Sequence, residues 1–423
     1  MYVYERSGGT WTFAQKLIAS HASAGSTFGS ALALDGNVLA VGAASQSTAG
    51  FDRQGATYVF ERTAGVWQET DKLLAASPAN LEGFGRALAL DGDTLLVGAP
   101  RNDDNCPFPA DCNTGAVYVF ERGLVSWIGT GILYASDVVP EPAFFDQRFG
   151  RSVAISGERA LVGAYGDDEL GMDAGAVYAF EHGFAGWSPT QKIFSPSPTP
   201  LQDRFGLAVA IDAGRAAVGA PFDDGDVPLS GAVFVLDLAP GGAWIVGAEL
   251  RPSDGAAFDD FGSGVDVAGG TVLAGAHYHD AGAGAWSGAA YVYDLERLGT
   301  SYCVHTASSL GVPATLGAFG SDSVGTNALT LRAEPVPDQP GLFFFGQVQA
   351  QLPFGNGFLC IGPPQVRIEP PLVPVSGVAT RSVDLAFFGI VPGTYDFQYW
   401  FRDPAAGGAF FNLADAVEVV FGP

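Results

Sequence analysis

Acidic residues that could bind a ligand or a metal recur in pairs along this chain. The pairs are Asp103 and Asp104, Asp167 and Asp168, and Asp223 and Asp224. Carboxylates gathered on one face of a protein can hold Ca²⁺ through their oxygen atoms. A plainer interpretation is that an Asp after a strand accepts backbone N–H bonds and caps a turn. Both interpretations depend on where the surrounding elements place these side chains.

Residues suited to catalysis are few, so we expect no enzyme activity. Of the five histidines, His277 and His279 alternate on an extended segment and would point to opposite sides. The sequence contains no Gly-x-Ser-x-Gly elbow, phosphate-binding loop or His-Glu-x-x-His motif. Paired carboxylates could serve a glycosidase, but among 45 acidic residues such pairs also arise by chance.

The four cysteines fall into two local pairs. Cys106 and Cys112 lie within one predicted loop, and Cys303 and Cys360 lie in the C-terminal region. Two disulfides, which persist outside the reducing cytosol, are the favoured interpretation, and four unpaired thiols are the alternative. A zinc site is less favoured, because no histidine accompanies the first pair and its spacing is poor.

A repeat organises the elements that carry these residues. Phe-Gly pairs start at 28, 84, 149, 205 and 261, and a Gly-Ala pair follows each one fourteen residues later. Each copy contains four strand-like runs separated by Gly, Asp and Asn turns, which predicts a four-stranded antiparallel meander. Such sheets must cover one another, and radial packing gives a β-propeller. Small residues in the first strand support this geometry, because Gly and Ala near a crowded axis let neighbouring backbones approach.

At these residues the chain resembles the FG-GAP repeats of integrin-alpha-type propellers and their bacterial relatives. Phe-Gly at 84–85 with Gly-Ala-Pro at 98–100 matches the full motif, as does the pair at 205–206 and 219–221. The resemblance covers residues 1–298. It implies a propeller that binds ligands on one face.

The resemblance does not carry a metal site with it. Many family members have a calcium loop of alternating Asp and Asn between the two halves of the motif, whereas here that segment is a tight turn such as 90–93. A calcium loop needs several oxygen ligands around a glycine. We therefore expect no cofactor, with calcium on the paired Asp residues as the alternative.

Strand polarity indicates where a ligand would bind. In an up-and-down blade, the loops from strand two to strand three and from strand four to the next blade lie on one face. These loops vary and are acidic, as binding loops on a rigid scaffold can be. Segments 98–115 and 127–149 are longer than in the other copies, and both insertions fall on this face of one blade. The candidate ligand-binding residues are Asp103, Asp104, Phe108, Phe144, Phe145, Asp146, Asp167, Asp168, Asp223 and Asp224. Neutral loop drift is the alternative.

Composition limits the partners and the location. With 20 basic and 45 acidic residues the net charge is −25, which opposes binding to nucleic acid or anionic membranes. No run of eighteen apolar residues predicts a membrane span, and no signal segment precedes the first strand. Cysteine usage favours a secreted or cell-surface protein, whose signal would then lie upstream.

The ends of the repeat region leave the blade number open. Residues 2–6 and 11–17 resemble strands three and four of a blade that lacks its first two strands, and the last copy lacks its fourth. Segment 11–17 could complete the last copy and give five blades. Alternatively, the repeats belong to a larger ring that is truncated here, which we favour.

Residues 299–423 differ in composition from the repeats. About seven short strand-like runs separated by Pro and Gly predict a β-sandwich, linked by a disulfide between Cys303 and Cys360.

The sequence predicts an all-β, non-catalytic binding or adhesion protein whose loop face binds a protein or a surface glycan. The alternatives are a polysaccharide-acting enzyme with a propeller scaffold and a purely structural cell-surface spacer. The sequence predicts no oligomeric state.

Overall fold

The computed structural model describes most of the chain. The described residues are all of 1–423 except 22, 49, 107–111, 138–145, 198–200, 225–226, 240, 253, 281–285, 296–299, 303–307, 312, 321–323, 325–326, 328, 376, 407–409 and 423.

The repeat region folds into antiparallel meanders, as predicted. The first four-stranded sheet contains β3(Phe28–Asp35), β4(Val38–Ala43), β5(Ala56–Thr63) and β6(Val66–Leu73). The second contains β7(Ala87–Asp91), β8(Thr94–Ala99), β9(Ala116–Arg122) and β10(Trp127–Leu133). The third contains β11(Ser152–Ser156), β12(Arg159–Ala164), β13(Ala176–Gly183) and β14(Gly186–Phe194). The fourth comprises β15(Ala208–Asp212), β16(Arg215–Ala220), β17(Ala232–Leu238) and β18(Trp244–Leu250), and the fifth has three strands, β19(Phe261–Ala268), β20(Thr271–Ala276) and β21(Ala289–Asp294). We call these five sheets units 1 to 5.

Hydrogen bonding within a unit explains the fixed interval between Phe-Gly and Gly-Ala. The backbone N–H of Gly150 donates to the carbonyl of Gly163 at 3.1 Å, and Gly206 donates to Gly219 at 3.0 Å. The Phe of the motif is fully buried in units 2 to 5, and the ring of Phe149 meets Tyr178 edge-to-face with centroids 5.3 Å apart. The motif therefore closes one end of the inner hairpin and anchors it to the third strand.

Glycines also bring neighbouring units into close contact. A Cβ on Gly98 of unit 2 would lie 2.1 Å from the carbonyl oxygen of Gly150 in unit 3, and one on Gly115 would lie 2.0 Å from that of Phe149. Gly115 and Phe149 form an isolated parallel bridge across this junction. Any larger residue at Gly98 or Gly115 would force the units apart.

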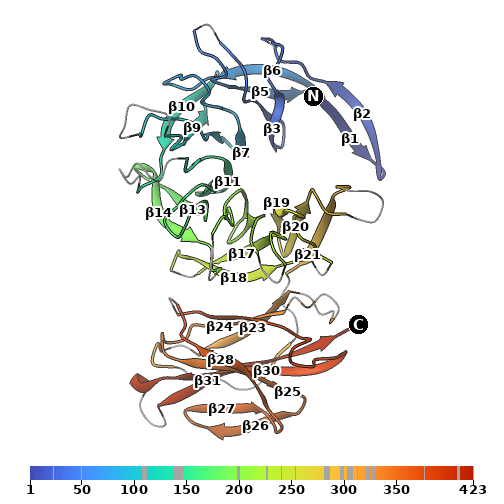
Figure 1. Cartoon of the computed structure of the whole chain (residues 1–423), viewed down its shortest axis with the longest axis vertical. Helices are drawn as coiled ribbons and strands as arrows, with labels where there is room; N and C mark the ends of the chain where they lie inside the picture. The colour runs from blue at the N-terminus through green and yellow to red at the C-terminus, as the bar shows by residue number, and fades with distance from the viewer. Residues whose placement is uncertain are drawn as a thin grey trace.

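The units are arranged as an arc around a common centre (Figure 1). Inner strands β3, β7, β11, β15 and β19 contact one another in that order and line the inside.

A separate hairpin of β1(Tyr2–Ser7) and β2(Thr10–Lys16) lies beyond unit 1, where the side-chain amide of Gln15 donates to the carbonyl of Trp67 at 2.8 Å. The interpretation in which segment 11–17 completes the last sheet is wrong, because β2 pairs with β1 and β19–β21 has no fourth described strand.

The C-terminal region holds two further sheets and a hairpin. One sheet contains β22(Thr300–Tyr302), β31(Phe411–Phe421), β30(Gly393–Arg402), β25(Gly341–Gly346) and β28(Val366–Leu372). The other contains β23(Thr315–Gly320), β24(Leu329–Glu334) and β29(Ala379–Val383), and β26(Gln349–Phe354) pairs with β27(Gly357–Ile361). One hydrophobic cluster joins both sheets, with Leu331 on one side and Phe397 on the other. The two sheets therefore share one core. The predicted boundary at 298 and 299 lies outside the described residues.

Buried charges link the two regions. Asp237 of β17 accepts hydrogen bonds from Arg215 of its own unit at 2.8 Å and from Arg332 of β24 at 2.7 Å. The Arg332 side chain is only 7% exposed. The outer strands of unit 4 therefore pack directly on the C-terminal region (Figure 1).

Candidate ligand-binding site

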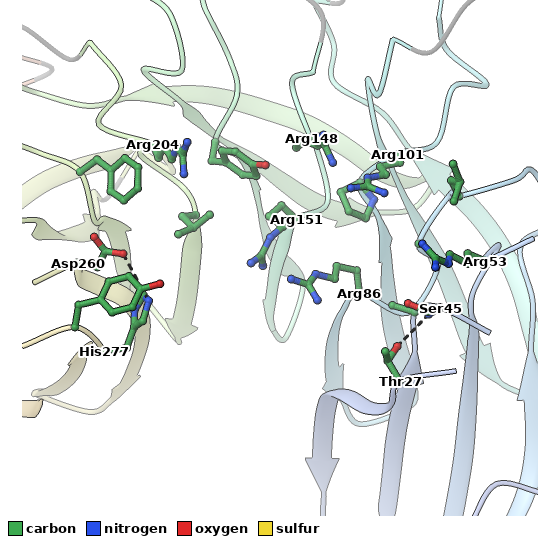
Figure 2. Close-up of a pocket in the computed structure, with 18 residues that line it drawn as sticks. Thr27, Ser45, Arg53, Arg86, Arg101, Arg148, Arg151, Arg204, Asp260 and His277 are labelled. Carbon is green, nitrogen blue, oxygen red and sulfur yellow. Dashed lines mark hydrogen bonds and ion pairs between the residues drawn. The ribbon is translucent and has the colours of Figure 1, made fainter. Parts of the chain in front are cut away.

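A cavity of about 650 Å³ lies where the predicted loop face meets the centre of the arc. It is built from the loops between the second and third strands, the segments that precede each Phe-Gly pair, and the starts of the inner strands (Figure 2). Its lining comprises Thr27, Ala44, Ser45, Arg53, Leu81, Gly83, Arg86, Pro100, Arg101, Arg148, Arg151, Tyr165, Arg204, Leu207, Phe222, Asp260, His277 and Tyr278. Six of the chain's 20 basic residues thus converge on one cavity of a strongly acidic protein.

The repeat places the arginines there. Arg86 and Arg151 directly follow a Phe-Gly pair, and Arg148 and Arg204 directly precede one. Because each Phe-Gly pair is fixed at a junction near the centre, the residues on both sides of it face the space between the units. Arg101 directly follows the Gly-Ala-Pro segment of unit 2. Figure 2 shows these side chains, from three different units, turned toward the same space.

Most of these guanidinium groups lack a neutralising partner. Among the described residues, Arg53, Arg86, Arg101 and Arg151 take part in no ion pair with a carboxylate. Burial lowers the pKa of Arg151, and the positive charges of Arg86 and Arg148 lower it further. Arginine nevertheless keeps its charge near neutral pH. The cavity therefore concentrates like charges, an arrangement that an anionic ligand would relieve.

Two further arginines are held in place by their neighbours. Arg148 forms a two-pronged ion pair with Asp146, in which Nη2 lies 2.7 Å from Oδ2. Arg204 stacks over the ring of Phe222, with its guanidinium carbon 4.2 Å from the ring centroid, and lies 5.7 Å from that of Tyr165. Stacking and bidentate pairing both fix the plane of a guanidinium group. The cavity thus combines fixed cations with unpaired ones.

Unit 5 contributes a different wall. Asp260 lies 3.6 Å from Nε2 of His277, whose Nδ1 is 2.9 Å from the hydroxyl of Ser263. In Figure 2, Asp260 and His277 lie across the cavity from Arg53 and Arg86. Tyr278 is 44% exposed and continues this wall. A ligand in the cavity would therefore meet cations on one side and hydrogen-bonding and aromatic groups on the other.

Comparison with protein families identifies the repeat. The FG-GAP repeat model matches residues 11–60, 67–120, 127–180, 187–236 and 244–293, together more than half of the chain. The chain belongs to the FG-GAP repeat family. Each matched segment runs from the Trp of one outer strand to the third strand of the next FG-GAP unit.

Other comparisons add little to the family assignment. No curated protein sequence is similar enough to this FG-GAP protein to count as a match. Among solved structures, it is similar to the periplasmic gluconolactonase of Pseudomonas aeruginosa, with 14% identity and a TM-score of 0.38 over 100% of this chain and 95% of the other. That similarity is too low to support any inference about function.

Asp167 and Asp223, two of the predicted ligand-binding residues, are buried within the FG-GAP units. Asp167 is 2% exposed, accepts a hydrogen bond from the hydroxyl of Tyr178 at 3.0 Å and lies 2.9 Å from Nζ of Lys192. Asp223 is 1% exposed and forms an ion pair with Arg251. Because they are enclosed, these two side chains stabilise their own loops, and neither of them lines the cavity.

The neighbouring acidic residues cap turns. Asp103 accepts the backbone N–H of Asn113 at 2.6 Å, Asp168 accepts that of Asp173 at 2.6 Å, and Asp224 accepts that of Leu229 at 3.0 Å. This is the capping role considered for paired Asp residues. Asp104 is exposed, and its N–H donates to the side-chain oxygen of Asn102 at 3.0 Å. None of these residues lines the cavity.

The two insertions meet next to the cavity. The N–H of Asp146 donates to the carbonyl of Cys112 at 2.8 Å, and that of Arg148 donates to the carbonyl of Asn113 at 3.1 Å. Asp146 thus lies next to the site, where it orients the lining residue Arg148. The other candidates in the insertions, Phe108, Phe144 and Phe145, lie outside the described residues.

Disulfide pairing agrees with prediction where the structure describes it. Cys106 and Cys112 form a disulfide within the β8–β9 loop. Cys360 is also disulfide-bonded, and its predicted partner Cys303 lies outside the described residues. The first disulfide closes the loop whose last residues contact Asp146.

Buried carboxylates recur beneath the loops of successive units. Glu82 is fully buried and accepts hydrogen bonds from Asn102 at 2.8 Å and from the hydroxyl of Tyr118 at 2.7 Å. Burial raises the pKa of Glu82. In unit 4, burial and then the adjacent carboxylate of Asp223 raise the pKa of Asp203 to about 7.

In unit 5, the buried carboxylate beneath the loop is Asp259, and its partner is a histidine. Nδ1 of His279 is 2.8 Å from Asp259, and this hydrogen bond raises the pKa of His279. His279 is 7% exposed, so its ring belongs to the interior of the loop.

Two further features are absent from the part of the chain that the structure describes. Within the described part of the chain, no group of three or more His, Cys, Asp or Glu side chains is placed to hold a metal ion. In the same residues no helix has the length and apolar character needed to cross a membrane.

Sequence reasoning missed the arginines. A usable signal was present, because Arg occupies a position flanking Phe-Gly in three of the five FG-GAP units. The net charge of −25 directed attention to the abundant acidic residues. The arginines are far apart in sequence and gather only when the units are arranged around one centre.

Proposed function

We propose that this FG-GAP protein is a non-catalytic binding protein that holds a macromolecular ligand on its loop face, where the arginine-lined cavity receives a negatively charged group of that ligand. The observation that carries the proposal is the convergence of Arg53, Arg86, Arg101 and Arg151 without ion-pair partners among the described residues. Unpaired like charges destabilise a fold, and proteins retain such costs mainly at functional sites.

The scaffold supports this role. Each arginine is carried by a loop or strand end next to a Phe-Gly junction, which places its backbone at the edge of the cavity. Arg148 and Arg204, whose guanidinium planes are held by Asp146 and Phe222, lose little entropy on binding. Charge-assisted bonds from arginine to carboxylate, sulfate or phosphate are among the stronger polar contacts in proteins.

We also propose that the protein acts outside the cytosol, either secreted or on a cell surface. The Cys106–Cys112 disulfide and the disulfide-bonded Cys360 support this location, because such bonds are rare in reducing compartments.

Binding of the whole chain to glycan and protein arrays tests the proposal. We expect at least one ligand whose binding weakens about tenfold or more when Arg86→Gln and Arg151→Gln are combined, since hydrogen bonds to charged groups contribute about 1.5–3 kcal/mol each. Arg159→Gln is the matched control, because Arg159 lies at the β11–β12 turn on the opposite face and pairs with Glu181 at 3.2 Å. Binding that is equally strong in the double variant and the control would contradict the proposal.

A further inference from the structure

We propose that the cavity takes the end of an acidic glycan, a short oligosaccharide that carries carboxylate or sulfate groups. This inference rests on the proposed function and narrows its ligand from any anionic macromolecule to one chemical class. Three features carry it: the size of the cavity, the overall charge of the protein, and the chemistry of the wall formed by unit 5.

Size and overall charge favour a chain end over an extended polyanion. A cavity of about 650 Å³ accommodates a small molecule or a few sugar rings. A net charge of −25 repels a long polyanion lying across the outer surface. At physiological salt this repulsion is screened over roughly 8 Å. The electrostatic energy of an anionic group that enters the cavity is therefore set mainly by the nearby arginines.

The wall of unit 5 suits a sugar ring. Asp260 can accept hydrogen bonds from sugar hydroxyl groups, and across the cavity the hydroxyl of Ser45, in unit 1, can both donate and accept (Figure 2). Tyr278 lines the cavity and is 44% exposed, and its ring meets edge-to-face that of Trp286, which lies next to it but does not line the cavity, with centroids 6.0 Å apart. Exposed aromatic faces provide a surface for the C–H groups of a pyranose ring. A sugar ring presents several hydroxyl groups to Asp260, whereas an acidic peptide presents mainly its backbone N–H groups.

Calorimetric titration of the whole protein tests the inference, with trigalacturonate as the carboxylated probe, a sulfated trisaccharide as the second anionic probe and galactotriose as the neutral one. We expect binding of at least one anionic sugar at physiological salt and no measurable binding of galactotriose. Arg86→Gln with Arg151→Gln should weaken that binding about tenfold or more. Tyr278→Ala should weaken it by a smaller factor, and Arg159→Gln should leave it unchanged.

Several outcomes would overturn the inference. Failure of both anionic sugars to bind would do so, as would equal affinity for tetraglutamate, which would assign the cavity to an acidic peptide instead. In either case, an array ligand that still depends on Arg86 and Arg151 would leave the proposed function standing. The variants Arg86→Lys and Arg151→Lys, together with melting curves for every variant, separate a loss of specific contacts from a loss of folding.

Discussion

Two charged layers of the loop face have opposite characters. The arginine-lined cavity has cations without carboxylate partners among the described residues, whereas the layer beneath the loops has carboxylates enclosed by Tyr, Asn, Lys and Arg partners. The comparison shows that charge alone does not mark a binding site. Charges that are satisfied and buried hold loops together, and charges left unpaired around a cavity are available to a ligand.

Removing the cation of the buried layer should have the largest effect. Nζ of Lys192 lies within 2.9 Å of Asp137, Asp167 and Glu169. Lys192→Met would leave these carboxylates without their counter-charge, and we expect the free energy of unfolding to fall by about 3–5 kcal/mol. Denaturant titration measures this change.

A matched control is available in unit 1. Lys72 has the same register opposite Tyr58 that Lys192 has opposite Tyr178, and no ion pair involves it among the described residues. Lys72→Met should therefore cost no more than about 1 kcal/mol. Equal losses in the two variants would mean that the carboxylates of unit 3 do not need Lys192.

The Asp203 and Asp223 pair should give the buried layer a pH dependence. A carboxyl group with a pKa of about 7 in the folded protein binds a proton more tightly than it does in the unfolded chain, where its pKa is about 3.9. The folded protein should therefore lose stability as the pH rises from about 4 to about 7. Asp203→Asn removes this loss, so it should raise the Tm at about pH 8 by several degrees and change it less at about pH 5.

Asp224→Asn provides the comparison for this test. Asp224 is exposed and accepts one backbone N–H bond, so its replacement should shift the Tm by a similar amount at both pH values. If Asp203→Asn behaved in the same way, Asp203 would be ionised in the folded protein at both pH values.

The scaffold could be predicted from the sequence, because a sequence interval that recurs unchanged indicates a structural unit that is repeated. The interval between Phe-Gly and Gly-Ala reflects a hydrogen bond that recurs in successive units, such as Gly150 to Gly163. Strand order then placed the variable loops on one face, and the local spacing of Cys106 and Cys112 favoured their pairing. These features depend on contacts that are close in sequence or repeated.

The roles of individual charged residues could not be predicted in the same way. Asp167 and Asp168 are adjacent in sequence, yet one is buried against Tyr178 and Lys192 while the other caps the turn at Asp173. Their difference depends on how this loop packs against the strands β13 and β14, which carry Tyr178 and Lys192. The arginine cavity depends on contacts between units, which composition and spacing do not report.

The smallest effect, and the sharpest contrast with Lys192, is expected from the cavity arginines. Combining Arg86→Gln with Arg151→Gln removes two like charges that have no carboxylate partner among the described residues, so the free energy of unfolding should stay constant or rise by up to about 1 kcal/mol. Denaturant titration without ligand measures this change, and Arg159→Gln, which breaks an ion pair with Glu181, is the control. A loss of several kcal/mol in the double variant would mean that these arginines support the fold, and the distinction between the two layers would fail. Unchanged stability together with lost binding is the result expected of residues kept for a ligand.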